Sequence, residues 1–102
     1  MGYPPFASFF HILLTGEAEA EVREAAEAFA EAVQKADGEK IALVLGPIPA
    51  ALPKFRGEYR YQLTLQAQDE EKLRSLVLAA QEEWKKRKGI RLHLALNPTN
   101  IV

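Results

Sequence analysis

The stretch that decides the fold is residues 59–66, with the sequence YRYQLTLQ. Large apolar side chains alternate there with polar ones, which is the period of a β-strand with one buried face and one face toward solvent. We therefore expect Tyr59 and Tyr61 to point into the protein and Arg60 to point outward. A second strand of the same kind is predicted at residues 90–96, where Pro98 ends the pattern.

The chain before this stretch divides into four segments. Residues 6–15 are rich in aromatic and β-branched types and apolar on both faces, which predicts a central strand. Residues 18–36 have apolar side chains at helical spacing, and Gly38 is expected to end that helix in the left-handed conformation. Residues 41–45 predict another strand, and the prolines and glycines of residues 46–57 predict a stiff loop.

A second helix is predicted after residue 69. Asp69 is its expected N-cap. Its expected buried side is Leu73, Leu76, Val77, Ala80 and Trp84. The basic residues 85–88 are expected in its last turn, with Gly89 closing it.

The resulting order is β-α-β-β-α-β. Two right-handed β-α-β crossovers joined in this order give an α+β, ferredoxin-like fold: a four-stranded antiparallel sheet with two helices on one face. The uncovered face is a candidate contact surface. Its expected members are Phe9, His11, Leu13, Arg60, Gln62, Thr64, Arg91 and His93.

Length and composition limit what the chain can be. It has 102 residues, no cysteine, 13 basic and 14 acidic residues, and a formal charge of −1. This describes a single domain over residues 1–102 without disulfides or a thiolate metal site. We expect a cytoplasmic protein, because no stretch has the length of a membrane span and no signal-peptide pattern is present. The charge is uneven, with −6 in residues 1–39, +3 in residues 40–68 and +2 in residues 69–102.

No arrangement typical of catalysis is found in the sequence, so we expect a non-catalytic segment. His11 and His93 would lie on one sheet face and offer two metal ligands without an evident third. The most concentrated basic group is Lys54, Arg56 and Arg60. These side chains suit phosphate oxygens, and the equally weighted alternative is solvated charge with Arg60 paired to a neighbouring strand.

Three separated motifs carry a resemblance to a known family. They are YPPF at residues 3–6, LGPIPA at residues 45–50 and RGEYRYQL at residues 56–63. The chain resembles the C-terminal domain of primosomal protein N-prime (PriA), the bacterial replication-restart helicase. The resemblance implies a ribosomal-protein-like fold and an excised domain of a larger ATP-dependent DNA helicase, with ATP and zinc as cofactors of the parent and none in this segment.

The resemblance also implies partners. These are forked or single-stranded DNA, other domains of the parent, and the acidic tail of single-stranded DNA-binding protein, with no membrane. The expected DNA contacts are Lys54, Arg56 and Arg60, while the open face docks to neighbouring domains. Lys72 and Arg74, at the start of the second helix, would bind the acidic tail. The alternatives are an interaction module with little DNA affinity and a free-standing RNA-binding domain.

Overall fold

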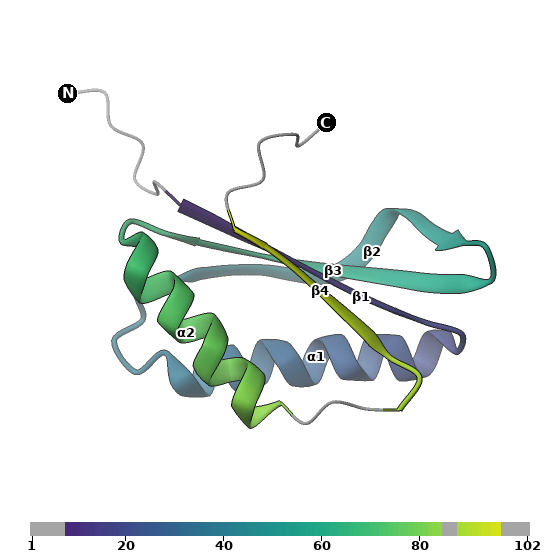
Figure 1. Ribbon diagram of the computed structural model, residues 1–102, viewed down its shortest axis with the longest axis horizontal. Helices are drawn as coiled ribbons and strands as arrows, with labels where there is room; N and C mark the ends of the chain where they lie inside the picture. Colours follow the sequence, from purple (N-terminus) through teal and green to yellow (C-terminus); the bar gives the residue numbers. More distant parts are fainter. Residues whose placement is uncertain (1–7, 85–87, 97–102) are drawn as a thin grey trace.

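The expected order of elements is confirmed. The computed structural model describes residues 8–84 and 88–96, except for the side chains of residues 51–53 and 55. The elements are β1 (Ser8–Gly16), α1 (Glu19–Ala36), β2 (Leu43–Phe55), β3 (Glu58–Ala67), α2 (Glu70–Glu83) and β4 (Arg91–Leu96). The four strands form one antiparallel sheet in the order β2-β3-β1-β4. Both helices cover the same face, so the α+β, ferredoxin-like prediction is correct (Figure 1).

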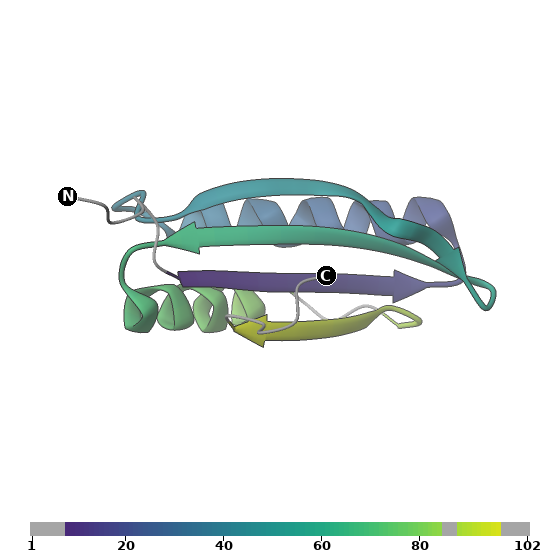
Figure 2. The same cartoon turned by 90° about the horizontal axis from the view of Figure 1, so that it is seen from above.

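β1 is a central strand, as its composition predicted. It pairs with β3 on one side and with β4 on the other, which is visible in the view from above (Figure 2). Its inward side chains Phe10, Ile12 and Leu14 are buried against the helices. Because side chains alternate along a strand, Phe9, His11 and Leu13 lie on the uncovered face.

The core lies between the sheet and the helices. The five residues expected on the buried side of the second helix are all buried. Four of them lie in α2, and the fifth, Trp84, is its C-cap. Trp84 joins the two helices: its indole Nε1 donates a hydrogen bond to the Ala25 carbonyl oxygen at 3.0 Å, and its ring packs edge-on against Phe29 with 5.5 Å between centroids. On β3, Tyr61, Leu63 and Leu65 are buried and Tyr59 is half-buried. The predicted inward side of β3 is therefore confirmed.

The prediction of a loop over residues 46–57 is wrong. β2 continues through Pro47, Pro49 and Pro53 to Phe55, and its pairing with β3 shifts register between Leu45 and Ile48 and again between Pro49 and Lys54. Prolines are tolerated because β2 is an edge strand, where a missing N–H donor costs no ladder bond on the outer side. The strand also begins at Leu43 rather than at residue 41.

The predicted ends of the helices are partly correct. Asp69 caps α2 by accepting a hydrogen bond from the Lys72 backbone N–H at 3.1 Å. After α1, the left-handed residue is Lys40, with φ 56°, and not Gly38. The Asp37 carboxylate organises this connection by accepting hydrogen bonds from the N–H groups of residues 41 and 42. Hydrogen bonds to the Asp37 side chain thus replace the expected glycine cap.

The prediction that basic residues fill the last turn of α2 is also wrong for the residues that the structure describes. The helix ends at Glu83, and Lys88 lies in a turn after it. Gly89 is left-handed, with φ 84°, but it precedes β4 instead of closing the helix. Residues 85–87 lie outside the described residues, as do residues 3–6 of the first family motif. Neither helix in the described part of the chain is long and apolar enough to cross a membrane.

The Tyr61 hydroxyl gives a pH-dependent prediction. It donates a hydrogen bond to Glu19 Oε2 at 3.2 Å. Burial, followed by this bond and the charge of Glu19, raises the pKa of Tyr61 above 10.0, against a smaller opposing effect of Arg23. The stabilisation is complete below the unfolded pKa of about 10 and is lost as pH rises through the folded pKa.

We therefore expect the free energy of unfolding in urea to fall between pH 9 and pH 11, and to fall less in Tyr61→Phe. Tyr59→Phe is the matched control, since it removes a neighbouring phenol that has no bond to Glu19. An equal fall in Tyr61→Phe and the wild type would contradict this role of Tyr61.

Candidate functional site

The uncovered face of the sheet is the most distinctive surface of the described chain. We call it the open face and define it by the strand pairing, because directly paired residues point to the same side. Its members are Phe9, His11, Leu13, Thr15, Leu43, Leu45, Ile48, Glu58, Arg60, Gln62, Thr64, Gln66, Arg91, His93 and Ala95. Glu58 is the one acidic residue among them, although the chain has 14 acidic residues.

One end of the open face is apolar. Leu43, Leu45 and Ile48 of β2 are 43%, 45% and 51% exposed, and Phe9 of β1 is 39% exposed. The three residues of β2 lie in successive rows of the sheet, and Phe9 shares the row of Leu43, with Gln66 of β3 between them. In one of these rows the Thr64 hydroxyl and His11 Nδ1 are 3.3 Å apart. This end combines exposed apolar area with hydrogen-bonding groups.

The other end of the open face is basic. Thr15 pairs with Arg60 on one side and with Arg91 on the other, so the two arginines lie in one row on either side of Thr15. Thr15 is only 6% exposed, and its Oγ1 has no hydrogen-bond partner. Two arginines in one row suit an anion with several oxygens.

Carboxylates restrict the directions from which an anion could approach the basic end. Glu17, Glu21 and Glu58 gather with Arg91 around a cavity of about 370 Å³ at the end of the sheet. An anion would therefore be repelled from that side and would reach Arg91 from the open face. Sequence analysis placed Arg91 on this face without choosing it as a binding residue, because only the strand register brings it beside Thr15.

The three predicted phosphate contacts are spread around the β2–β3 hairpin. Lys54 pairs with Tyr59, and its Nζ lies 5.1 Å from the centre of that ring, so it is on the side of the sheet that faces the helices. Arg56 is exposed in the turn, with φ 53°. Arg60 lies on the open face. The hairpin therefore presents cations on both faces and at its tip, and not as one flat patch.

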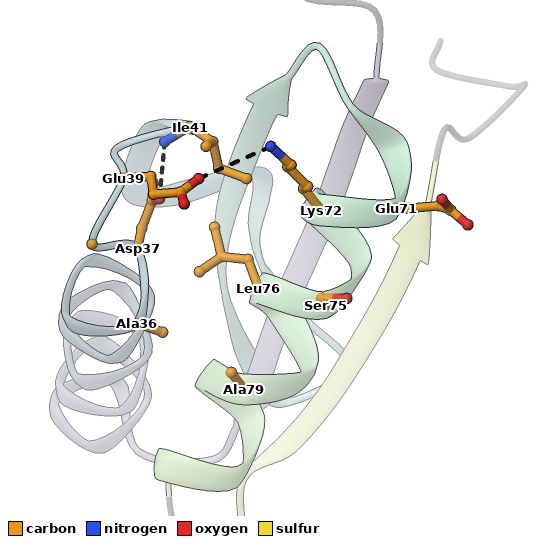
Figure 3. A pocket seen from close by; sticks show the side chains of 10 residues that line it. Ala36, Asp37, Glu39, Ile41, Glu71, Lys72, Ser75, Leu76 and Ala79 are labelled. Carbon is orange, nitrogen blue, oxygen red and sulfur yellow. Dashed lines mark hydrogen bonds and ion pairs between the residues drawn. The ribbon is translucent and has the colours of Figure 1, made fainter.

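The predicted partner-binding residues lie in the first turns of α2, beside a groove of about 500 Å³ between the two helices (Figure 3). Lys72 reaches across the groove to Glu39, with 4.0 Å between Nζ and Oε1. Arg74 pairs with Glu70 at 3.1 Å. Ile41 and Leu76 provide apolar surface, and Asp37 and Glu71 add two further carboxylates. Both predicted cations are thus already paired with glutamates.

The two histidines lie diagonally on neighbouring strands of the open face, because His11 pairs with Ala95 and His93 with Leu13. The alternation of side chains along the two strands predicted that the histidines would share this face. Within residues 8–84 and 88–96 no group of three or more metal-ligating side chains is found. The described part of the face therefore presents imidazoles without the further ligands of a protein metal site.

Comparison with known proteins gives two kinds of similarity. Residues 1–99 match the family model described as the primosomal protein N C-terminal domain. The chain is also 34% identical over 97 residues to the "Probable replication restart protein PriA" of Deinococcus radiodurans, a match that covers 94% of this chain and 10% of that protein.

Solved structures share the fold. The de novo designed protein Foldit4 has a TM-score of 0.67 and 19% identity, covering 91% of this chain and 98% of its own. A hydantoinase/carbamoylase family amidase from Burkholderia ambifaria has a TM-score of 0.58 and 11% identity, covering 90% of this chain and 28% of its own. At these identities the similarity concerns architecture alone.

Proposed function

Since the chain belongs to the primosomal protein N C-terminal domain family, we propose that it holds DNA by its phosphates as a non-catalytic domain of a longer replication restart protein. The chain covers only 10% of the length of its Deinococcus radiodurans relative. Helicase activity, ATP, zinc and packing on a helicase core belong to this proposal as properties of the longer protein. DNA with a single-stranded or forked part is the proposed ligand.

The distribution of charge carries the proposal. Lys54, Arg56 and Arg60 surround the tip of the β2–β3 hairpin, and Arg91 lies beyond Thr15 in the same row as Arg60. On the opposite layer, α1 has five glutamates against two bases and α2 has four against two. A polyanion would be repelled by the helices and attracted to the hairpin end of the sheet. The domain would therefore bind DNA with the hairpin end of its sheet and keep its helices away from it.

The test replaces Lys54, Arg56 and Arg60 together by glutamine and titrates forked DNA at several salt concentrations. Each lost phosphate contact removes about 0.9 from the slope of log affinity against log salt. We expect the slope to become shallower by about 2 to 3 and the affinity at 0.1 M salt to fall at least about tenfold. Fluorescence anisotropy measures both quantities, and circular dichroism checks that the variant is folded.

The matched control changes the same number of charges on the helix layer: Lys35→Gln, Lys72→Gln and Arg74→Gln, all of which are exposed. We expect this variant to bind DNA nearly as well as the wild type. Equal losses in the two variants would mean that net charge, and not the hairpin, governs binding. Unchanged binding after the hairpin replacement would remove Lys54, Arg56 and Arg60 as phosphate contacts.

Binding of an acidic tail at Lys72 and Arg74 stays a prediction without a specific observation in its favour. The two cations are engaged by Glu39 and Glu70, and the groove beside them has two further carboxylates, Asp37 and Glu71. An acidic peptide would have to displace both pairs. If such a peptide bound and forked DNA did not, the domain would be an interaction module.

A further inference from the structure

We propose that the apolar end of the open face receives the bases of single-stranded nucleic acid, while the strand's phosphates lie toward Arg60 and Arg91. This inference rests on the proposed function and adds a second set of contacts to it, between the bases and the open face. Sequence analysis assigned the open face to neighbouring domains instead. The charge, the exposed surface and the shape of the face suit nucleobases.

The charge of the open face fits a polyanion from Arg60 to Leu43. The residues of the face include two arginines, two histidines and one carboxylate, Glu58, which lies next to Arg60 at the outer limit of the basic end. A strand that runs from Arg60 toward Leu43 leads away from Glu58 and meets no carboxylate among the other residues of the face. Attraction at one end would position its bases over the other end.

The apolar end offers contacts that suit base faces. Leu45 and Ile48 are about half exposed, and Gln62 of β3 lies opposite Ile48 in the row that continues to Leu13. Apolar side chains contact the flat faces of bases, and an amide both donates and accepts hydrogen bonds at their edges. The ring of Phe9 adds an aromatic surface at the same end. These contacts are tolerant of base identity.

The shape of the face favours a single strand over a duplex. A four-stranded sheet presents a broad surface, and neither helix is on this side (Figure 1). Bases in a duplex are stacked inside it, and reading them needs an element that enters a groove. An unpaired strand can lay its base faces on a sheet. The proposed ligand is therefore single-stranded DNA or a single-stranded end at a fork.

The experiment compares two oligonucleotides of 12 units with the same number of phosphates, oligo(dT) and an abasic deoxyribose-phosphate chain. We expect the wild type to bind oligo(dT) at least about fivefold more tightly than the abasic chain, because only the former can place bases on the face. The double variant Leu45→Gln, Ile48→Gln should lose this preference and keep its affinity for the abasic chain. Both side chains are exposed, so the variant should fold.

Leu78→Gln is the control. Leu78 is 55% exposed on α2, so the same apolar-to-amide change occurs on the opposite layer. It should leave both affinities unchanged. Equal binding of oligo(dT) and the abasic chain by the wild type would overturn the inference and leave phosphate binding intact, as would a base preference that survives the double variant. Absence of binding to either oligonucleotide and to forked DNA would instead reject the proposed function.

Discussion

Trp84→Ala is expected to lower the free energy of unfolding by about 3 to 5 kcal/mol, the range for truncating a buried aromatic residue. Trp84 is 5% exposed and closes the gap between α1 and the end of α2. The change removes the edge-on contact with Phe29 and the hydrogen bond from the indole to the Ala25 carbonyl oxygen. For a domain of this size, with typical stability of about 5 to 15 kcal/mol, such a loss is a large fraction of the total.

Trp84→Phe separates the two contributions. It keeps an aromatic ring near Phe29 and removes the indole N–H, so we expect a smaller loss of about 1 to 2 kcal/mol. Denaturant unfolding followed by circular dichroism measures both variants. If Trp84→Ala cost less than about 1 kcal/mol, the helix-to-helix contact would not contribute to the core as the structure indicates.

Gly46→Ala is expected to have a comparable effect for a different reason. Gly46 has φ 104°, which L-residues with a side chain rarely adopt, and a Cβ atom there would lie 2.7 Å from the backbone oxygen of Gln62. The conformational cost is about 1 to 2 kcal/mol, and a backbone clash adds about 1 to 3 kcal/mol. We therefore expect about 2 to 5 kcal/mol of destabilisation and a disturbed β2–β3 pairing at Leu45.

Gly57→Ala is the matched control. Gly57 also has positive φ, 83°, but a Cβ atom there would have nothing within 4 Å. Its cost should be limited to the conformational part, about 1 to 2 kcal/mol. Thermal and urea unfolding of the two variants give the difference. Equal losses would show that the close approach of β2 to β3 at Gly46 is not important for stability.

The helices and β3 were predictable because their signals are local. The spacing of Val22, Phe29 and Val33 identifies the buried side of α1 from a period of 3.6 residues, and all three are buried. The alternation in residues 59–66 correctly placed Tyr61 inward and Arg60 outward. Each of these inferences needs only the neighbours of a residue along the chain.

β2 was only half predictable. Its prolines carry a strong local signal against a strand, and this signal would be correct for a strand between two others. At the edge of the sheet β2 has a strand on one side only, so a missing donor on its outer side costs no ladder bond, and the pairing shifts register twice between Leu45 and Lys54. The position of a strand within a sheet depends on pairing between residues far apart in the chain. The edge position of β2 could therefore not be predicted from its own residues.

The candidate site likewise combines features that follow from the sequence with features that depend on tertiary packing. The sequence by itself determined which side of each strand a residue occupies, because the alternation of side chains follows from the pleat of the backbone. Only the tertiary structure decided that β4 lies beside β1, which brings Arg91 to Thr15 and Arg60, and that β2 leaves Leu45 and Ile48 exposed. Register and strand neighbours depend on contacts between residues far apart in the chain, and such contacts form only when the helices and the sheet pack together.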